Sequence, residues 1–573
     1  MIFKGGKGRK EKLSNSRFIH SKSWFPRTVE ACLVEEGMKR QLLEGSSMYQ
    51  IGGQPGHRAE EHVFALKSII AKYRSQGQLV IIQTSDIAKF FDKELIEDAI
   101  LTSLKRGANP KACKLLYELN RGTQIRVRTG VGMTEYVEAG ALVGQGTIGG
   151  ALVSQAVLDE GISGVFAPGG QDELNYGSVP VSPLIFQDDV IHGAGGITEA
   201  RLANDKIDIA VKSLNLRLNQ EKTVCLVMGT NKQKRKVKLD LEAQPLMCGE
   251  FETELKDQFK WLGQILSSGG LSDSVSCTVA AREGKIRGAG IEITQIVNDW
   301  RAKIVGGFET ALLLWELCCV PSLLHGAGTW TEISTATEKK LDQIQCWYLK
   351  LALQVGQGAA SASLLWDTAS LDMSLRVSRE KILFVLYLRN LDEDTFASKA
   401  YKEQKVKKWP GLAAETLKIC QMLHIEDCNE TKQNMSSYKQ VLFKALHHKN
   451  EEKLRLLGKG KCERILHEDY GKKEYLLSKN IFNVREHYRT RYGLLPFAGN
   501  YSHNKKYASS NWLCRCSEAR EEESHLTSGN CKVFGDLQDK FGDLSQDENL
   551  IKFFSEVLLR RDQIDKVDTD LST

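Results

Sequence analysis

The chain has 573 residues, of which 42% are hydrophobic and 26% charged, a globular composition that excludes a disordered or collagen-like protein. Its length is enough for roughly three or four domains. The formal net charge of +6 is a mild basic excess. Each basic segment alone is more simply a solvated surface, but several on one chain favour a polyanionic partner. These segments are Lys4–Lys12, Asn231–Lys238, Lys402–Lys408 and Ser502–Tyr507.

The fourteen cysteines do not form a disulfide framework in a chain of this length, and the polar N-terminal segment is not a secretory signal. The longest apolar segment, Ala311–Leu324, contains Glu316 and Pro321 and is shorter than the ~20 residues that a membrane-spanning helix needs. We therefore expect no membrane segment and an intracellular, reducing compartment, in which cysteines are free thiols or metal ligands.

A strand followed by a helix is the first predicted element that can position a functional side chain. The apolar run Leu79–Gln83 is typical of a buried strand, and the segment ends at Asp86. An aspartate in that place can point into a metal site shared with other segments. A helix follows and stops near Gly107 and Pro110. Its predicted apolar face is formed by Leu95, Ala99, Ile100 and Leu104.

A glycine-rich segment, ALVGQGTIGGALVS, surrounds Gln145. Its glycines leave the backbone accessible to a ligand, and the helix predicted from about Ala151 would offer its N-terminus to phosphate. Taken alone this pattern is a weak signal, and ordinary packing of a helix against a strand is the simpler interpretation.

Two adjacent acids, Asp188 and Asp189, interrupt an apolar segment. Leu184–Phe186 and Val190–Ile191 are predicted to be short strands on either side of a tight turn. Burial of ionised carboxylates costs several kcal/mol unless a positive charge offsets it, and Mg²⁺ prefers oxygen ligands. A solvent-exposed Asx-type turn explains this stretch at least as well when it is taken alone.

Beyond about residue 270, apolar residues recur at helical spacing and strand signals are few. Ile286–Ile304 and Glu338–Leu353 are typical segments. The first half is therefore predicted to be mixed α and β and the second half mostly helical. A small third region begins near Tyr501, and Glu548–Arg561 forms one amphipathic helix near the end of the chain.

The small region contains a Cys/His cluster with the pattern C-x-C-x8-H-x5-C. Three thiolates and one imidazole are the donors of a closed, tetrahedral zinc site, although the single-residue first gap is tighter than usual. Reduced surface cysteines beside a satisfied histidine are the alternative. The candidate ligands are Cys514, Cys516, His525 and Cys531.

The helix predicted at Val484–Gly493, just before this region, alternates arginines with tyrosines. Such a face suits contacts with phosphates and stacking on bases. An amphipathic helix with a solvated basic side is an equally good interpretation. The residues are Arg485, Arg489, Arg491, Tyr488 and Tyr492.

Seven segments resemble, in residue pattern and in order, motifs of the reverse transcriptase domain of non-LTR (LINE-type) retrotransposons. The fingers motifs are FKGGKGRKEKLSNSRFI and YQIGGQPGHRAEEHVFALKSII; the later motifs are DIAKFFD, GQGTIGGALVS, FQDDV, LNLRLNQEKT and the primer-grip FKWLG. Any one of them is weak, but seven in the family's order are specific. The resemblance covers residues 1–270 closely and extends more loosely beyond, where the Cys/His cluster resembles the zinc knuckle of many such elements.

The resemblance implies a role for each matching residue. The catalytic residues would be Asp86, Asp188, Asp189 and Lys222, with Asp86 and Asp188 as the principal Mg²⁺ ligands, Asp189 beside them, and Lys222 beside the leaving pyrophosphate. Nucleotide and template would contact Arg17, Phe91, Gln145 and Gly146, with Phe91 screening the sugar. The primer grip would be Trp261, Leu262 and Gly263. Two departures are Gln187 in the hairpin and Gly-Gln-Gly in place of the widespread Pro-Gln-Gly.

The fold that this resemblance implies is α+β: a right-hand polymerase with an antiparallel palm sheet, a helical thumb and a small zinc knuckle. The expected domains are fingers and palm at 1–270, thumb at 271–420, a helical connector at 421–505, the CCHC knuckle at 506–535 and a C-terminal helix and tail at 536–573. Since no endonuclease segment is recognisable, we expect a piece of a longer polyprotein.

The implied function is RNA-directed DNA synthesis with two Mg²⁺ ions and a structural Zn²⁺. The expected partners are an RNA template, a DNA primer and dNTPs, and the family resemblance places the protein in the cytoplasm and the nucleus. The alternative is a catalytically decayed, nucleic-acid-binding remnant of such an element. A polymerase that uses a DNA template, or none, is also compatible with the palm motifs. The sequence does not indicate an oligomeric state.

Overall fold

A computed structural model shows how these segments are arranged in space. It describes residues 2–3, 16–17, 23–88, 90, 95–122, 124–129, 132–138, 148–166, 174–176, 179–181, 183–298, 307–356, 358–431, 434–459, 462, 464–478, 481–495, 497, 513–544 and 547–572. The described part combines one five-stranded sheet and several two-stranded ones with many helices, so the predicted α+β class is confirmed.

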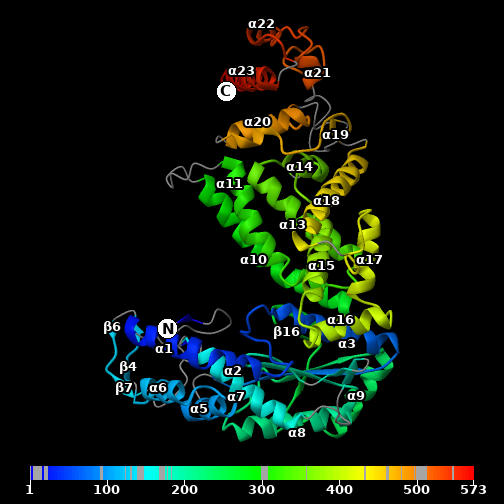
Figure 1. Cartoon of the computed structure of the whole chain (residues 1–573). Helices are drawn as coiled ribbons and strands as arrows, with labels where there is room; N and C mark the ends of the chain where they lie inside the picture. Colours follow the sequence, from blue (N-terminus) through cyan, green and yellow to red (C-terminus); the bar gives the residue numbers. More distant parts are fainter. Residues whose placement is uncertain are drawn as a thin grey trace.

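The five-stranded sheet lies at one end of the molecule (Figure 1). Its strand order is β10-β11-β3-β12-β15. The central strand β3, Val80–Asp86, pairs antiparallel with β11, Asp189–Ala194, on one side and with β12, Val224–Met228, on the other. The edges are β10, Leu184–Phe186, and β15, Glu254–Leu255. β-Branched and other apolar residues dominate β3 and β12, and such runs suit strands that are covered on both faces.

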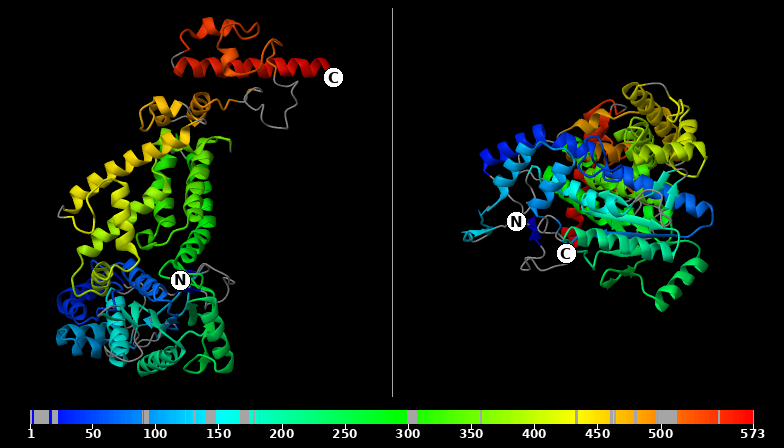
Figure 2. Two further views of the ribbon diagram at one scale, coloured as in Figure 1. Left: turned by 90° about the vertical axis from the view of Figure 1, so that its right-hand side faces the viewer. Right: turned by 60° about the horizontal axis from the view of Figure 1, so that its bottom comes forward.

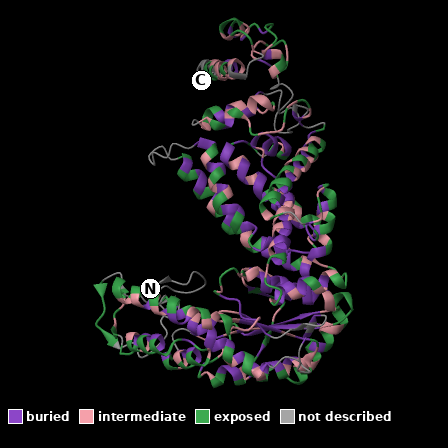
Figure 3. Cartoon of the chain, viewed as in Figure 1, coloured by how far each residue is buried: buried purple, intermediate pink, exposed green. Residues whose placement is uncertain are grey.

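Helices cover both faces of this sheet, and its central strands are buried (Figure 3). One face shares a core with helix α3, Ala59–Ser75, through residues such as Ile82 and Leu226. The opposite face packs against α7, Gly150–Val165, and against two helices drawn below the sheet in Figure 1. These two are α8, Ile197–Ser213, and α9, Asn231–Ala243.

A further helical layer lies beside the sheet. It comprises α1 at Trp24–Gly37, α2 at Lys39–Glu44, α5 at Ile96–Lys105 and α6 at Pro110–Asn120. The predicted face of α5 is partly wrong, because Leu95 and Leu104 are 41% and 39% exposed. Ala99 is buried as predicted, and Ile96 joins it on the inner face, since α6 and α7 cover α5 from that side.

Short strand pairs complete the first half of the chain. They are β1 Ile2–Phe3 with β2 Ser16–Arg17, β4 Gln124–Ile125 with β7 Val137–Glu138, β5 Arg128–Thr129 with β6 Gly132–Met133, β8 Leu174–Tyr176 with β9 Val179–Val181, β13 Met247–Cys248 with β14 Phe251–Glu252, and β16 Gln258–Trp261 with β17 Gln264–Ser267.

A stack of helices rises from the sheet and forms the middle of the molecule (Figures 1 and 2). Its elements are α10 Leu271–Asn298, α11 Gly307–Leu314, the π-helical turn η3 Trp315–Cys319, α12 Val320–Leu323, η4 Ala327–Thr329, α13 Thr335–Leu353, α14 Ser361–Thr368, α15 Met373–Arg389, α16 Phe396–Val406, α17 Leu412–Met422, α18 Met435–Gly458, α19 Arg464–His467, η5 Glu474–Leu477 and α20 Ile481–Arg491.

Two hydrophobic cores run through this stack. One joins α15 to α18 with α3 and the sheet, and the other joins α10 to α15 with later residues such as Leu454 and Tyr488. Since α18 lies in the predicted connector yet packs on α14 and α15, the segments predicted as thumb and connector share both cores. The boundary at residue 420 stays a prediction from sequence.

Helix α20 differs from both interpretations of its sequence, because Tyr488 and Arg491 are buried against the rest of the helical stack. Tyr488 is fully buried and hydrogen-bonds Ser363. The guanidinium of Arg491 is 6% exposed and pairs with the buried carboxylate of Asp367 at 3.2 Å, which also accepts from the Tyr492 hydroxyl at 2.7 Å. These side chains tie α20 to α14, so they are not free to stack on bases.

The C-terminal unit forms a separate small core beyond α20 (Figure 2). It contains α21 at Glu523–Leu526, α22 at Asp536–Phe541 and α23 at Asp547–Ser572. Phe553 and Val557 of α23 share this core with Cys514 and Cys531. The predicted amphipathic C-terminal helix thus covers the Cys/His region. None of the helices in the described ranges has the length and apolar character needed to cross a membrane.

Candidate active site and metal centre

Asp86 and Asp189 are brought together by strand register. Asp86 ends β3, Asp189 begins β11, and the two residues are direct partners across the antiparallel pair. Side chains of such a pair lie on the same face of the sheet, with Cβ atoms ~5 Å apart. Two carboxylates separated by about one hundred positions in the sequence therefore face one space, as a shared metal site requires.

Lys222 and Asn219 surround the Asp86 carboxylate. Lys222 Nζ lies 2.9 Å from Oδ1 and 3.1 Å from Oδ2, and Asn219 Nδ2 donates to Oδ2 at 3.1 Å. The Asn219 backbone N–H also donates to the Asp86 carbonyl at 2.8 Å. The Asp86 side chain is 16% exposed and that of Lys222 is 64% exposed. The lysine therefore offsets the charge of the acid from the solvent side.

Asn219 is a contact that the sequence did not single out. It lies within LNLRLNQEKT, three residues before Lys222. The N–H groups of Lys222 and Thr223 both donate to the Asn219 carbonyl. This turn aims the Lys222 side chain at the end of β3. In the sequence, this contact could have been found from the position of the asparagine, three residues before the predicted catalytic lysine.

An open pocket of about 450 Å³ contains this carboxylate pair. The turn of the β16–β17 hairpin forms another wall through Trp261, Leu262 and Gly263. The pocket thus joins two of the predicted catalytic acids, the predicted lysine and the predicted primer-grip segment. Phe259 and Lys260 of the primer-grip motif and Glu221 of LNLRLNQEKT also line the pocket. The lining residues that sequence reasoning missed are Thr84, Val224, Lys256 and Gln258.

Asp188 lies in the two-residue turn between β10 and β11. Its neighbour Gln187 has a φ of +58°, a left-handed conformation that is uncommon outside glycine. The Gln50 side-chain oxygen accepts from the Gln187 backbone N–H at 3.3 Å and helps to hold the turn. Asp188 is half-buried but does not line the pocket. In this structure Asp189, and not Asp188, is the direct partner of Asp86.

Four predicted nucleotide contacts cannot be placed by side chain. Phe91, Gln145 and Gly146 lie outside the described residues, and Arg17 is described only as part of the β1–β2 backbone pair. The helix predicted to follow the glycine-rich segment is present as α7 and begins at Gly150. The roles of these four residues remain predictions from the sequence.

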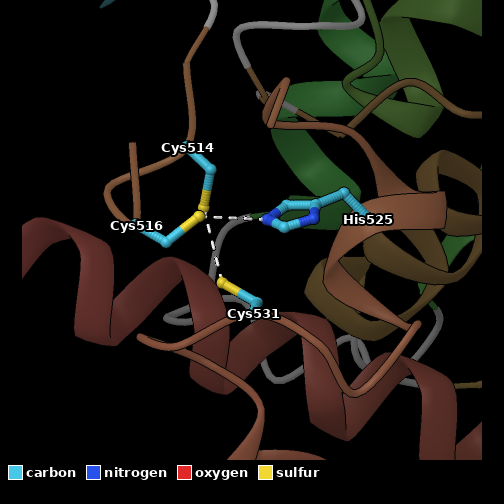
Figure 4. Close-up of side chains that lie close together, drawn as sticks. All are labelled: Cys514, Cys516, His525 and Cys531. Atoms are coloured by element: carbon cyan, nitrogen blue, oxygen red, sulfur yellow. Dashed lines mark hydrogen bonds between the residues drawn. The ribbon is translucent and has the colours of Figure 1, made fainter. Parts of the chain in front are cut away.

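The four candidate zinc ligands converge in the C-terminal unit (Figure 4). Their ligand atoms all lie within 4.8 Å of one another. Cys514 Sγ is 3.6 Å from Cys531 Sγ, and Cys516 Sγ is 3.3 Å from His525 Nε2. A tetrahedral zinc site with metal–sulfur distances of ~2.3 Å separates two sulfurs by ~3.8 Å, so the observed spacing fits zinc.

Tight local structure produces this convergence. The Cys514 N–H donates to the Ala519 carbonyl and the Ser517 N–H to the Cys514 carbonyl, each at 2.8 Å. Ser517 turns the chain with a φ of +63°. This turn allows the single-residue gap between the first two cysteines, which looked unusual in the sequence. His525 comes from the short helix α21, and Cys531 follows it.

The thiols differ in acidity. Burial raises the pKa of the Cys514 thiol to about 12. Burial acts in the same direction on Cys516, but the backbone N–H of Glu518 and the His525 ring outweigh it and lower the pKa of this thiol to about 7. A thiolate is the form that binds a metal, so at neutral pH Cys516 is readier to bind one than Cys514.

A second group, Cys420, Asp427 and Cys428, also has its ligand atoms within 4.8 Å of one another. Both thiols are buried. The Cys428 N–H donates to Cys420 Sγ at 3.5 Å, and the Tyr438 hydroxyl lies at the same distance from that sulfur. Three donor side chains leave a tetrahedral site incomplete, while the hydrogen bonds already satisfy the sulfur. We interpret this group as part of the core.

The donor sets suit different metals. Three thiolates and an imidazole suit zinc, whereas carboxylate oxygens suit Mg²⁺. Asp86 and Asp189 fit Mg²⁺ because they present carboxylates to one open, polar pocket. In the described part of the chain, the three predicted acids are not among the groups whose ligand atoms all lie within 4.8 Å. The pair, rather than a gathered triad, is the observed feature.

Comparisons with solved structures find telomerases. Telomerase from Candida albicans, solved with a fragment of telomeric RNA, is similar with a TM-score of 0.29 and 7% identity, over 66% of this chain and 58% of that chain. For apo telomerase from Candida tropicalis the values are 0.30, 11%, 73% and 60%. The chain thus spans less than two thirds of those proteins. No family model and no curated protein sequence matches it.

Proposed function

We propose that this chain is an RNA-directed DNA polymerase of the non-LTR retrotransposon type. The observation that carries the proposal is the pairing of Asp86 with Asp189 across β3 and β11, inside a pocket that Lys222 and the β16–β17 turn complete. Four segments of the sequence meet there, and each contains a motif that resembles this family. The substrates would be an RNA template, a DNA primer and dNTPs.

The proposed reaction joins a deoxynucleotide to the primer 3′-hydroxyl and releases pyrophosphate. Asp86 and Asp189, with Asp188 beside them, would hold Mg²⁺, which when bound stabilises the charge on the attacking and leaving oxygens. Lys222 would neutralise or protonate the departing pyrophosphate. Its amino group already approaches the Asp86 carboxylate at 2.9 Å from the solvent side, so it lies where the charge of a triphosphate would accumulate.

The remaining pocket residues would position the primer. Lys256 and Lys260 add positive charge beside the β16–β17 turn, and cations of this kind attract a phosphate backbone. The three lining lysines match the three lining acids in number. We propose further that the sheet and its helices are the palm and that the helices from α10 onward form the thumb and connector. The Cys514–Cys531 region would be a structural zinc knuckle.

The experiment is primer extension on an RNA template with dNTPs and Mg²⁺. Wild type is compared with the double variant Asp188→Ala, Asp189→Ala and with Asp205→Asn, which alters an exposed acid of α8. We expect extension by wild type and by Asp205→Asn and none by the double variant. RNA binding without extension by any of the three would favour the decayed, nucleic-acid-binding remnant. Extension on DNA templates alone would contradict the proposed template.

A further inference from the structure

The turn of the β16–β17 hairpin needs external support. Its central residues Leu262 and Gly263 have φ values of +42° and +80°, as a type I′ turn requires. A leucine in this region is strained. Among the strands that the structure describes, β16 and β17 pair only with each other, so the outer edge of β17 has no strand partner there. The same turn lines the pocket of Asp86 and Asp189.

Helix α10 supplies this support through one stripe of polar residues. Ser274 Oγ accepts from the Ser267 N–H at 2.9 Å, and Thr278 Oγ1 accepts from the Ile265 N–H at 2.9 Å. One helical turn further, Arg282 Nη2 donates to the Gly263 carbonyl at 2.8 Å. The backbone groups of Ser267, Ile265 and Gly263, which are two positions apart, are therefore bonded to side chains of α10 that are four positions apart.

The spacing of these contacts along the helix matches their spacing along the strand. Four residues of an α-helix rise ~6 Å, and two residues of a strand advance ~6.6 Å. A helix that runs beside a strand edge can therefore offer one side chain to each outward-facing backbone group. The match holds over the two steps from Ser274 through Thr278 to Arg282.

Arg282 also fixes the far side of the pocket wall. Its Nη1 donates to the carbonyls of Leu323 and His325, at 2.8 Å and 2.9 Å. One guanidinium thus joins the hairpin turn to the loop that follows α12. Its planar fork of five donors is suited to such a contact with several carbonyls, which a lysine cannot reproduce.

A second connection holds the hairpin from α3. The Gln264 side chain, 2% exposed, accepts from Lys67 Nζ at 2.6 Å and donates to Thr329 Oγ1 at 3.1 Å. Lys67 also contacts Thr329 Oγ1 directly at 3.3 Å. Polar links from α10 and from α3 therefore both meet at the hairpin.

We infer that Arg282 is a positioning residue, which sets the place of the Trp261–Gly263 turn relative to Asp86 and Asp189. It does not touch the reacting atoms and acts through the turn. This inference rests on the proposed function, because it assigns the turn a part in placing the primer. It adds that the first thumb helix determines the geometry of the pocket through a specific stripe of side chains.

The test compares Arg282→Lys with Arg287→Lys. Arg287 lies on the same helix, pairs with Glu283 at 2.8 Å and lies over the Trp347 ring, away from the hairpin contacts. We expect Arg282→Lys to lower the rate of single-nucleotide incorporation about 10- to 100-fold, since small misplacements have effects of this size. The dissociation constant of the primer–template should change by less than about threefold. Arg287→Lys should match wild type in both.

A milder variant and a second readout separate positioning from loss of folding. Thr278→Val removes one hydroxyl of the stripe, and we expect the same split with a smaller loss of rate. In both stripe variants, hydrogen exchange at the Ile265 and Ser267 amides should quicken while that of β3 stays unchanged. If rate and affinity fall together with the folded fraction, the role is only structural and the inference is overturned.

The remaining outcomes distinguish the inference from the proposed function. Incorporation by Arg282→Lys at the wild-type rate, with active wild type, overturns the inference and leaves the proposed function standing. A wild-type chain that incorporates no nucleotide overturns the proposed function, and the positioning role for Arg282 falls with it.

Discussion

The carboxylate pocket and the Cys/His cluster are built in opposite ways. The pocket takes Asp86, Asp189 and Lys222 from separate strands and turns of one sheet. The cluster takes all four ligands from 18 consecutive positions, Cys514 to Cys531. The pocket is open and polar, whereas two of the cluster's thiols are buried in a small core. A reaction site needs a rigid frame and access, while a structural metal site needs closure.

Loss of the zinc that we propose for the cluster should have the largest effect on stability. Structural zinc contributes ~10 kcal/mol or more of folding free energy at neutral pH. We expect Cys531→Ser to abolish zinc binding and to remove hydrogen-exchange protection from residues 513–572. The exposed Cys318→Ser is the matched control and should keep one zinc per chain.

The Cys531→Ser variant also tests whether the pocket works independently of the C-terminal unit. Because the pocket lies on the sheet and not on the C-terminal unit, nucleotide incorporation by Cys531→Ser should stay within about tenfold of wild type. We would ascribe any loss within that range to weaker RNA binding. An unchanged C-terminal unit after zinc removal would contradict the structural role.

Removing a carboxylate charge from the pocket should abolish most of the activity and leave the zinc-binding unit unchanged. Asp86→Asn keeps the shape of the side chain and removes its charge, so we expect incorporation to fall at least ~10³-fold, as when a group that stabilises charge in a transition state is lost. Zinc content and thermal stability should stay as in wild type. Asp205→Asn is the control, and incorporation by Asp86→Asn near the wild-type rate would contradict the role of the pair.

Lys222 separates charge neutralisation from proton donation. Lys222→Ala should lower the incorporation rate about 100-fold, within the range for a general acid. Lys222→Arg keeps the charge but does not release its proton. A large recovery in the arginine variant indicates neutralisation, and a small one indicates protonation. The control Lys212→Ala alters an exposed ion pair on α8, and an equal loss there would contradict a specific role for Lys222.

The smallest predicted effect is on how stability depends on pH, and it involves Lys67, which bonds Gln264 of the hairpin. Burial, with Arg282 and Lys381 nearby, lowers the pKa of Lys67 to about 7, against ~10.4 in an unfolded chain. Between these values the unfolded chain holds a proton that the folded one lacks. The free energy of unfolding should therefore rise with pH, by up to ~1.4 kcal/mol per pH unit.

Denaturant midpoints at pH 7 and pH 8.5 measure this slope. Lys67→Met should flatten it, and Lys114→Met, an exposed lysine of α6, should not. Equal slopes in wild type and Lys67→Met would show that Lys67 is charged in the folded protein throughout this range.

The sequence predicted the two regions with different completeness. Spacing within one short segment identified the four candidate ligands that the structure brings together, because a short segment can close on itself. It also predicted β3 and the tight turn before Asp189. It did not predict that Asp189 pairs with Asp86, since register depends on which strands meet. The contacts from Arg282 and Asn219 were missed for the same reason, as each joins segments that only the tertiary structure brings together.

The α20 helix shows the limit of reasoning from composition. Its arginines and tyrosines allowed either an RNA-binding face or an amphipathic helix with a solvated basic side, and the buried Arg491 fits neither. Their partners decide the outcome, and the buried Asp367 that orders them lies more than one hundred residues away. A pattern that is local in sequence therefore did not determine a contact that is distant.

Iron-mediated cleavage of the backbone tests most directly whether the carboxylate pair is a metal site. Fe²⁺ is added in place of Mg²⁺ together with a reductant and peroxide, and the fragments are mapped. We predict cuts near Asp86 and Asp189 that excess Mg²⁺ suppresses and that Asp86→Asn abolishes. Cuts confined to the Cys514–Cys531 region, or cuts at the pocket that persist in Asp86→Asn, would contradict the account.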